Sequence, residues 1–575
     1  MSSDSQSHDH HEEGFIRKYI FSVDHKIIGI QYGITSLLFL LFGFSLMAIM
    51  RWQLAYPDTV IPIVGFLFGE SGTLASEQYN SLGAMHGTIM IFLGIVPLAV
   101  GAFGNYLVPL QIGAIDMAFP KLNAASYWTY FVGGVIMISS FFMPEGAARS
   151  GWTSDPPLSI FENGQTIWLI SMIFLITSSL LGSMNIIVTI VQLRAPGLSW
   201  MRLPIFVWAQ FVTSFLLVLA FPPLEAAAVM QLMDRVAGTS FFLPSGLVMS
   251  GEIVDVAGSG SPLLWQHLFW FLAHPEVYVL ILAALGIVVE ILANNTRKPI
   301  WGFKSIIYSM VFLGFCSFIV WAHHMFLTGM GQAMSAFFQT TTMIISIPSV
   351  VILTSYFLSL WGGSIRFNTP MLFALAFLPM FGIGGLTGLP LGLAASDIYL
   401  HDTYYVIGHF HYVVAPGTIF ALFAGIYYWF PKMTGKKMNE MLGKLHFWPS
   451  LIFMNGIFMP MFIQGLAGVS RRLADGGVSY AHASGVLEWN EFMSISAFFL
   501  GLAQIPFIIN IVMSLFAGEK ASRNPWDSTT IEWSAPSPPV GHGNFDKPVN
   551  VYHSAYEYSV PDSKKDFTPQ FEKNG

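Results

Sequence analysis

Residues 263–292 read LLWQHLFWFLAHPEVYVLILAALGIVVEIL, a stretch of 30 residues with almost no charge. About 20 apolar residues are enough for a helix to cross a bilayer, so this stretch is long enough to span a membrane. It nevertheless contains His274, Glu276 and Tyr278. Ionisable side chains at bilayer depth are costly and usually functional. The stretch therefore predicts a membrane helix that carries chemistry.

The composition of the whole chain agrees with that prediction. Of the 575 residues, 54% are apolar and 10% are charged, which excludes an ordinary soluble globular protein. We predict an all-α polytopic membrane protein with twelve transmembrane helices in a single bundle, because the chain contains twelve sufficiently long apolar stretches. Their approximate cores are residues 29–50, 83–110, 126–143, 167–190, 204–230, 263–292, 302–330, 335–362, 370–393, 404–430, 446–466 and 491–517.

Lysine and arginine are distributed unevenly between the two sides of the predicted bundle. Numbering the loops from the N-terminus places twenty of the 25 basic residues on the side that holds both termini. The positive-inside rule then predicts that both termini are cytoplasmic. We expect a cytoplasmic N-terminal tail over residues 1–25, the twelve-helix domain over residues 26–520, and an extended cytoplasmic C-terminal tail over residues 521–575. The single cysteine, Cys316, excludes a disulfide framework and a thiolate metal cluster.

Six histidines lie inside the predicted spans, namely His86, His274, His323, His324, His409 and His411. Imidazole is the commonest protein ligand for redox metals, so we interpret the set as metal sites. His409 and His411 point about 200° apart on a helix, which favours two large cofactors such as haems on opposite faces. His274, His323 and His324 fit a copper ion bound by three imidazoles. Any one histidine has an alternative role as a core residue, but six would each need a buried partner.

Four motifs carry a resemblance to a known family. They are Trp265-Gln-His-Leu-Phe-Trp270, His274-Pro-Glu-Val-Tyr278, Trp321-Ala-His-His-Met325, and His401-Asp-Thr-Tyr-Tyr405 with His409-Phe-His411. From about His25 to about Asn544 the chain resembles subunit I of the haem-copper oxidase superfamily, the A-type cytochrome c oxidases in particular. The resemblance implies a catalytic subunit that reduces O2 to water at a high-spin haem and copper centre and couples this reaction to proton pumping.

The resemblance also implies the ligands of two haems, expected to be of the a type, and of one copper ion, CuB. These ligands are His86 and His411 for the low-spin haem, His409 for the high-spin haem, and His274, His323 and His324 for the copper. Tyr278 corresponds to the tyrosine that the family joins covalently to the first copper histidine. Breaking O2 takes four electrons, of which iron supplies two and copper one, so Tyr278 is expected to supply the last.

A proton pathway is implied by polar residues that interrupt the apolar stretches. Asp116, near Asn105 and Asn123, is expected on the cytoplasmic side, and Glu276 deep in the sixth span. The set resembles the D pathway, in which protons pass from the aspartate to the buried glutamate. Taken alone, Asp116 has an alternative as a loop carboxylate that caps a helix.

Other positions on the outer side resemble residues around the cofactors. Arg471 and Arg472 resemble the pair that neutralises haem propionates, and Arg51 resembles the arginine that contacts the formyl group of the low-spin haem. The alternative for Arg51 is an arginine that snorkels from the end of its helix.

Two tryptophans and a further metal site complete the resemblance. Trp152 is expected near the haem edges and Trp270 near the copper, although membrane tryptophans are often interface residues. His401 and Asp402 resemble the subunit I ligands of a magnesium or manganese ion at the contact with subunit II. Two ligands are too few for such an ion, so a partner chain or water must complete the site.

The chain departs from the family at its second proton route, the K pathway. Ile352 replaces the lysine of that route, and Val289 replaces a serine. Glu290 replaces a common histidine about three turns from Tyr278 on the cytoplasmic side. We hypothesise that Glu290 offers a substitute intake for protons. The alternative is a helix-end acid that meets water or Lys298.

The electron donor is inferred from residues that the chain lacks. Phe42, Leu46, Gln78 and Ser81 stand near the positions where quinol-oxidising relatives carry polar and charged residues. This favours cytochrome c or a similar small protein as donor, acting through the CuA centre of a separate subunit II. Subunit III, O2 and membrane lipid are the other expected partners, nucleic acid is not expected, and the expected location is the bacterial inner membrane.

Two alternative functions remain at this point. A nitric oxide reductase of the same superfamily would need a non-haem iron, usually with an added carboxylate, and the missing lysine leans towards it. Tyr278, Asp116 and Glu276 lean against it. A metal-free transporter or channel is the other alternative, and visible haem bands would exclude it.

Overall fold

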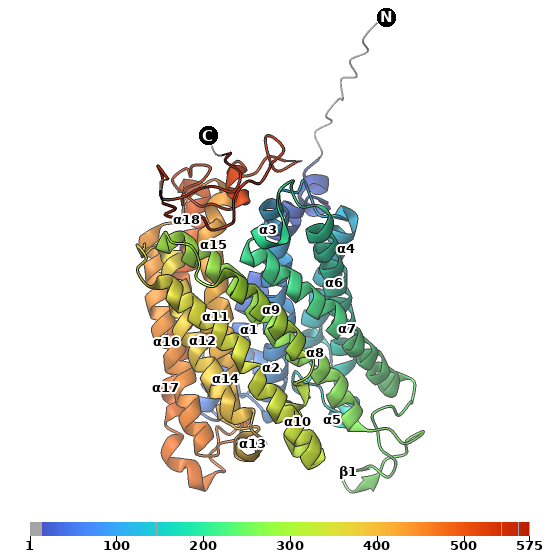
Figure 1. Cartoon of the computed structure of the whole chain (residues 1–575). Helices are drawn as coiled ribbons and strands as arrows, with labels where there is room; N and C mark the ends of the chain where they lie inside the picture. The colour runs from blue at the N-terminus through green and yellow to red at the C-terminus, as the bar shows by residue number, and fades with distance from the viewer. Residues whose placement is uncertain (1–13, 145, 542, 562, 574–575) are drawn as a thin grey trace, which may run out of the picture.

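The computed structural model describes residues 14–144, 146–541, 543–561 and 563–573, and within them the chain forms a bundle of long helices with very little β-structure (Figure 1). Twelve helical segments of this described part are long and apolar enough to cross a membrane, which confirms the predicted fold class. The segments are His25–Ala55, Ser76–Ile112, Pro120–Phe142, Gln165–Gln192, Ile205–Val236, Pro262–Thr296, Phe303–Thr328, Gly331–Leu360, Thr369–Leu391, Tyr404–Thr434, Glu440–Leu466 and Trp489–Ala517.

Half of these spans are single α-helices and half are composite. The single helices are α1 (His25–Ala55), α6 (Gln165–Gln192), α7 (Ile205–Val236), α8 (Pro262–Thr296), α12 (Thr369–Leu391) and α16 (Glu440–Leu466). The composite spans are α2 (Ser76–Thr88) with η3 (Ile89–Ile95), η4 (Pro97–Ala102) and α3 (Phe103–Ile112); α4 (Pro120–Ser139) with η5 (Ser140–Phe142); α9 (Phe303–Ser317) with η7 (Trp321–Thr328); α10 (Gly331–Ile344) with α11 (Ser346–Leu360); α14 (Tyr404–Val413) with η8 (Val414–Ile419) and α15 (Phe420–Thr434); and α17 (Trp489–Ala503) with α18 (Ile505–Ala517).

Short elements lie between the spans, before the first span and after the last. They are η1 (Ile16–Ile20), η2 (Gly65–Phe68), α5 (Leu158–Phe161), η6 (Trp200–Arg202), α13 (Ala394–Leu400), η9 (Ala481–Val486), η10 (Ile531–Ser534), and the strands β1 (Val248–Met249) and β2 (Glu252–Ile253). The two strands form an antiparallel pair in which Val248 lies opposite Ile253.

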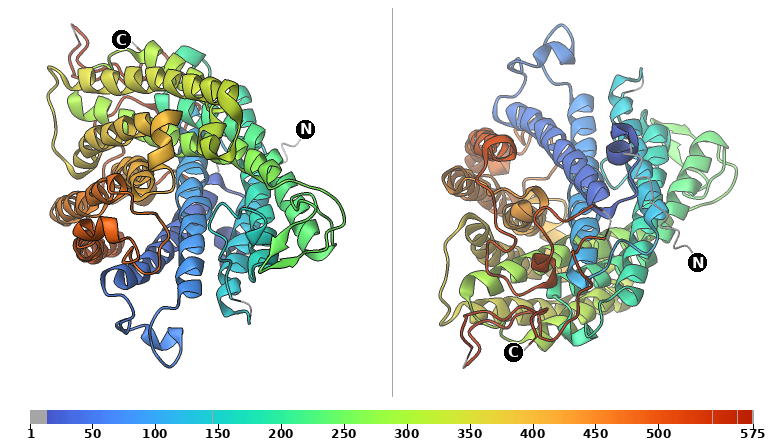
Figure 2. Two further views of the ribbon diagram at one scale, coloured as in Figure 1. Left: turned by 90° about the horizontal axis from the view of Figure 1, so that it is seen from below. Right: turned by 90° about the horizontal axis from the view of Figure 1, so that it is seen from above.

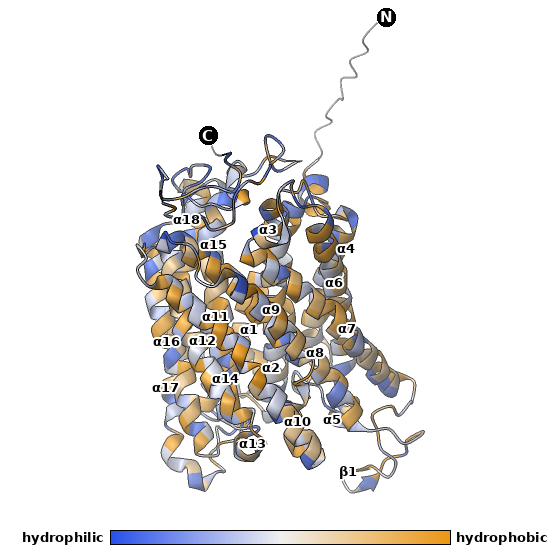
Figure 3. Ribbon diagram, viewed as in Figure 1, coloured by the Kyte–Doolittle hydropathy of each residue, from blue (hydrophilic) through white to orange (hydrophobic). Residues whose placement is uncertain are grey.

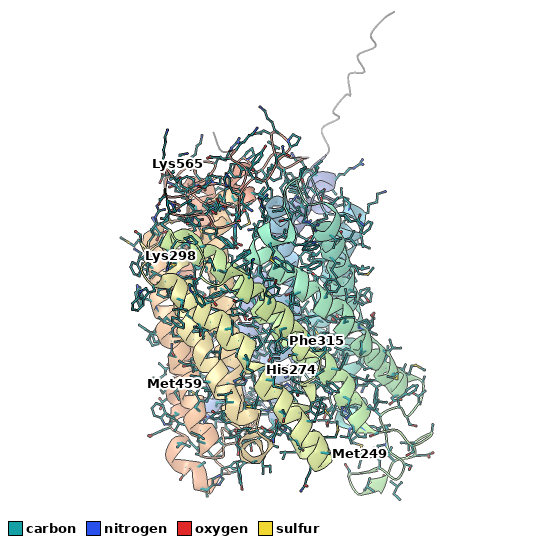
Figure 4. The ribbon with its side chains drawn as sticks, in the orientation of Figure 1. Met249, His274, Lys298, Phe315, Met459 and Lys565 are labelled. Atoms are coloured by element: carbon teal, nitrogen blue, oxygen red, sulfur yellow. The ribbon has the colours of Figure 1, made fainter. Side chains whose placement is uncertain are left out.

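Helix α8 lies at the centre of the bundle. In its most apolar 18-residue window 89% of the residues are buried, against 28% for α1, most of whose other side chains are partly exposed. Pro275 lies inside α8 without ending the helix. As a result, His274, Glu276 and Tyr278 lie in the interior rather than facing lipid, and Figure 4 shows His274 between the two ends of the bundle.

The two ends of the bundle differ in what they carry. The described chain ends lie at one end, and β1 lies at the other (Figure 1). Figure 3 shows mostly hydrophobic helices and a hydrophilic covering where the chain ends lie. Lys298 and Lys565 are labelled at that same end in Figure 4. The positive-inside rule predicts that this end is cytoplasmic, so we call it the cytoplasmic end and the opposite one the outer end.

The C-terminal segment crosses the cytoplasmic end of the bundle (Figure 2, right). Trp533, Tyr558 and Gln570 of this segment are almost fully buried. Arg297, at the end of α8, forms an ion pair with Asp566 in which Nε and Oδ2 are 2.8 Å apart. Part of the segment is therefore packed between and against the helix ends.

Candidate metal centre

Three histidines from two segments converge inside the bundle. Helix α8 presents His274, and η7 presents His323 and His324 just before its backbone leaves helical geometry at Met325. Nε2 of His324 lies 3.2 Å from Nδ1 of His274 and 3.2 Å from Nε2 of His323. One nitrogen of each residue lies within 4.8 Å of the other two. The structure thus brings together the three imidazoles predicted to bind copper.

Neighbouring groups fix the orientation of these rings. Nδ1 of His323 lies 3.0 Å from Oγ1 of Thr342, and that hydroxyl donates its own hydrogen to the carbonyl of Phe338 at 2.6 Å. The hydroxyl must therefore accept from Nδ1, which leaves Nε2 of His323 free to bind a metal. Trp270 stacks on His324, with ring centroids 3.8 Å apart and an angle of 11°. The sequence did not indicate Thr342, since no motif connects it to the histidines.

Tyr278 lies beside the first of these histidines. The ring centroids of Tyr278 and His274 are 4.8 Å apart, as expected for residues on the same face of α8. Nε2 of His274 is buried and has no hydrogen-bond partner within the described chain. A buried nitrogen without a partner is costly, and it is available for a further bond.

The other three histidines are held by backbone carbonyl groups. Their Nδ1 atoms lie 2.8 to 2.9 Å from carbonyl oxygens, in the pairs His86 with Gly43, His409 with Gly384, and His411 with Ile407. A carbonyl group only accepts, so each Nδ1 carries the hydrogen and each Nε2 is free to bind a metal. The glycines could not have been identified from the motifs, because they lie on other helices.

These histidines form two separate groups. His411 lies close enough to His86 for electrostatic interaction, whereas His409 interacts with His274 and His323. His409 and His411 thus point to different sites, as their spacing predicted. All three rings of this carbonyl-held set lie deep in the bundle but are only partly covered by protein, so they border internal space. Large planar ligands with axial imidazoles fit this donor set.

Arg51 lies at the outer end of α1 but does not reach the surface. Its side chain is 1% exposed, and its partners are the neutral groups Ser494 Oγ at 3.2 Å and Asn490 Oδ1 at 3.4 Å. No carboxylate of the described chain forms an ion pair with it. The alternative of a snorkelling arginine is therefore wrong. A buried cation with only neutral partners is costly, and it indicates an anionic or polar ligand nearby.

The outer end brings together a charged cluster. Arg471 forms an ion pair with Asp402, and His401 Nδ1 lies 3.3 Å from Oδ2 of the buried Asp397. Burial opposes ionisation of Asp402, but Arg471, His401 and Arg472 together outweigh it and lower the pKa of this carboxyl group. Burial lowers the pKa of Arg472 to about 10. Asp397, which the motifs did not indicate, adds a second carboxylate beside His401.

Trp152 connects the two groups of histidines. Its ring lies 6.0 Å, edge to face, from Trp270, which stacks on His324. An added Cβ on Gly87, the residue after His86, would lie 3.0 Å from Cβ of Trp152. Trp152 therefore packs against both the His86 segment and the tryptophan beside the copper histidines.

The predicted proton-pathway residues gather at the cytoplasmic end of α3 and α4. Asn105 donates to the carbonyl of Gly101 at 2.7 Å, and both amide atoms of the buried Asn123 lack partners within the described chain. Asp116 accepts from the amide of Met117 at 2.6 Å, which is not a helix cap because α4 begins at Pro120. Burial raises the pKa of Asp116.

Hydroxyl groups continue inwards from Asn123. Ser126 Oγ donates to the backbone carbonyl of Asn123 at 2.8 Å, and Tyr32 Oη donates to Ser126 Oγ at 3.1 Å. Tyr32 also lies 3.3 Å from Oγ of Ser178. Tyr32, Ser126 and Ser178 are far apart in the sequence, so this series of hydroxyl groups is visible only in the folded structure.

Glu276 lies in the interior without a partner. It is 2% exposed, and neither carboxylate oxygen has a hydrogen-bond partner among the described residues. Such a group is more stable when it carries a proton. It is therefore suited to hold a proton close to His274.

The structure places the residues that depart from the family's K pathway. Val289 and Ile352 are completely buried in apolar surroundings. Glu290 is 3% exposed, and Lys298 instead donates to the carbonyl of Trp361 at 2.6 Å. The alternative in which Glu290 meets water or Lys298 is therefore wrong.

Comparisons with known proteins agree with this geometry. The model of the family described as cytochrome C and quinol oxidase polypeptide I matches residues 27–502. The chain belongs to this family. Cytochrome c oxidase subunit 1 from a Synechocystis species is 45% identical, over 94% of this chain and 93% of its own length. Alternative cytochrome c oxidase subunit 1 from Bradyrhizobium diazoefficiens is 42% identical, with coverage of 98% and 94%.

A solved structure shows the same fold. It is that of a haem-copper terminal oxidase dimer, with a TM-score of 0.67, 19% identity, and coverage of 86% of this chain and 84% of that one. Family membership makes the chain a multi-pass membrane oxidoreductase that uses haem and copper and works with other oxidase subunits. The comparisons favour the oxidase over the nitric oxide reductase.

Proposed function

We propose that this chain is the catalytic subunit of a bacterial inner-membrane terminal oxidase that reduces O2 to water with electrons from cytochrome c and pumps protons. The observation that carries the proposal is the cluster of His274, His323 and His324 with Tyr278 beside it. Electrons would arrive through the CuA centre of subunit II, with subunit III as a further partner.

The free nitrogens of the histidines supply the ligands for the cofactors. We assign His86 and His411 to the low-spin haem, His409 to the high-spin haem, both of the a type, and the three clustered imidazoles to CuB. The bound metals supply the electron transfer and O2 binding. The unpartnered Nε2 of His274 supports a covalent bond to Tyr278, whose phenol would supply the fourth electron and a proton.

Protons for the reaction would come from the cytoplasmic end. Asp116 collects them, Asn105 and Asn123 lie next on the way, and Glu276 holds a proton near the centre. The hydroxyl series from Ser126 to Ser178 supports this order, because it extends inwards from Asn123. Neutral hydroxyls pass protons on through hydrogen bonds.

The outer cluster would bind the negatively charged parts of the cofactors and a further ion. Arg471 and Arg472 are suited to haem propionates, and Arg51 to the polar edge of the low-spin haem. Trp152 and Trp270 would pack against the haem edges and the copper ligands. His401 and Asp402, with Asp397 alongside, would provide part of a magnesium or manganese site at the contact with subunit II.

The donor set tests the proposal against a nitric oxide reductase. Within the described residues, the cluster of candidate metal ligands contains three histidines and no carboxylate. This donor set suits copper rather than a non-haem iron with an added carboxylate. Beyond the copper of the CuA centre, the purified complex should contain about one copper for every two haem irons by elemental analysis. It should consume O2 with reduced cytochrome c, and His323→Asn should abolish this activity while preserving the low-spin haem bands. Quinol-driven activity alone, or iron in place of copper, would contradict the proposal.

A further inference from the structure

Glu290 is a buried acid at the cytoplasmic end of α8 that the proposed proton pathway does not use. Its Oε1 accepts a hydrogen bond from Oη of Tyr556 at 2.6 Å and from the amide of Phe206 at 3.3 Å. Tyr556 belongs to the C-terminal segment, and its Oη also accepts from the amide of Ile205 at 2.7 Å. No lysine or arginine of the described chain forms an ion pair with Glu290. Its charge is therefore uncompensated by a cation, which favours the protonated form.

A second buried acid faces Glu290 from the C-terminal segment. Glu532 is fully buried, and its Oε1 accepts from Nε2 of Gln111 at 3.0 Å, whereas Oε2 has no partner within the described residues. Burial raises the pKa of Glu532. The two carboxyl groups are close enough to interact, and so are Tyr428 and Tyr356 with Glu290. Two buried acids that repel each other retain a proton between them more readily than either one alone.

A buried hydroxyl group lies near Glu290, on the side of the metal centre. Tyr356 of α11 interacts with Glu290, and its Oη donates to the carbonyl of Leu285 at 2.8 Å. Leu285 lies five residues from Glu290 on α8, which is about 7.5 Å closer to Tyr278. Tyr356 therefore places a hydroxyl at a depth between those of Glu290 and Tyr278.

A further hydroxyl lies on the same face of α11. Ser349 is seven residues before Tyr356, so the two share a helix face and lie about 10 Å apart along the axis. Helices α8 and α11 pack together and run in the same direction (Figure 1). Because the two helices run in the same direction, Ser349 lies on the Tyr278 side of Tyr356. Ile352, between the two hydroxyls, is the apolar gap in this series.

We propose that Glu290, held by Tyr556 of the C-terminal segment, is the buried proton carrier at the cytoplasmic end of a second proton route that runs by Tyr356 towards Tyr278. This inference rests on the proposed function, because it concerns protons consumed at the same centre. Each electron that enters a buried centre leaves an uncompensated negative charge unless a proton follows it. Reduction of O2 to two waters takes four electrons and four protons, and Glu290 is placed to supply those that accompany reduction of the metals.

The alternative is that Glu290 only fastens the C-terminal segment to α7 and α8. Both roles use the hydrogen bond to Tyr556, so loss of stability does not separate them. Proton transfer, however, changes the protonation of Glu290 when the metals are reduced, and a fastening role does not.

The test uses the purified holoenzyme with Glu290→Gln, Tyr556→Phe and Tyr356→Phe. Glu519→Gln is the matched control, because Glu519 is an exposed acid at the same end, paired with Lys437 at 3.2 Å. Stopped-flow reduction without O2 follows the two haems separately. We expect Glu290→Gln to slow reduction of the high-spin haem about tenfold or more, with reduction of the low-spin haem unchanged. We expect smaller effects in the two phenylalanine variants and none in the control.

Infrared difference spectra between oxidised and reduced enzyme give the second measurement. A carboxylic acid band that is present in the natural protein and absent in Glu290→Gln supports the inference. If Glu290→Gln reduces both haems at the rates of the natural protein, or lowers the melting temperature without loss of the carboxylic acid band, the inference is overturned. If Glu290→Gln does not assemble, Tyr556→Phe decides: slower reduction of the high-spin haem with a shifted carboxylic acid band supports the inference, and natural values of both overturn it. Absence of O2 uptake by the natural protein would instead contradict the proposed function.

Discussion

A methyl group added at Gly388 tests the proposed role of His409. Gly388 lies in α12, and a Cβ at this position would be 2.7 Å from Cε1 of His409 and 3.4 Å from both ring nitrogens. Carbon atoms in contact prefer about 3.5 Å or more, so the ring must move by about 0.8 Å. Overpacking of this kind costs about 1–3 kcal/mol. The better helix propensity of alanine offsets about 0.5–1 kcal/mol of that cost.

The displaced ring of His409 would turn Nε2 away from the direction in which it would bind the high-spin haem. His409 Nδ1 is fixed to the carbonyl of Gly384 at 2.9 Å, so the movement also strains this hydrogen bond. We expect Gly388→Ala to lose most of the carbon monoxide difference spectrum of the high-spin haem while keeping the low-spin bands. Gly385→Ala is the matched control, because its Cβ would have no atom within 4 Å. Full carbon monoxide binding in Gly388→Ala would refute the assignment of His409.

Three further predictions concern neighbouring groups. Thr342→Val leaves Nδ1 of His323 without its acceptor, so we expect copper affinity to fall about 10- to 100-fold, measured as the copper-to-iron ratio. Thr341 is the control: its hydroxyl bonds only to backbone carbonyls, so Thr341→Val should keep the ratio. Arg51→Met should shift the low-spin haem absorption band without changing the high-spin signal, and an unmoved band would refute contact with that haem. Hydrogen bonds from Arg297 hold the pKa of Asp566 below its usual value, so this pair stabilises the docked C-terminal segment above about pH 4 and the contribution is lost as the pH falls through the lowered pKa. Protection of the amides of residues 549–570 from exchange, taken relative to the intrinsic rate at each pH, should therefore fall in acid, and Asp566→Asn should lower it already at neutral pH. Equal protection in both proteins would contradict the role of the pair.

The sequence predicted the features that depend on local spacing. Twelve apolar stretches predicted the twelve spans, and the two-residue spacing of His409 and His411 predicted that they serve different sites. The position of Tyr278 beside His274 followed from their four-residue separation on a helix. The histidines that converge in the interior were recognised because an imidazole at bilayer depth is costly without a function.

Contacts between distant segments could not be predicted from the sequence. Thr342, Gly43 and Gly384 orient ring nitrogens from other helices, and no pattern connects them to their histidines. Arg51 was left with two interpretations because burial, which decides between them, is a property of the packed bundle. The hydrogen bond between Tyr556 and Glu290 joins residues 266 positions apart, so it could not be found from spacing.

An oxygen pulse given to the complex in liposomes tests the central claim most directly, with reduced cytochrome c as donor and with O2 and external pH recorded together. We predict loss of O2 with transient external acidification, which would establish an oxidase that pumps protons without the lysine that Ile352 replaces. Turnover of nitric oxide without loss of O2 under the same electron supply would contradict the account.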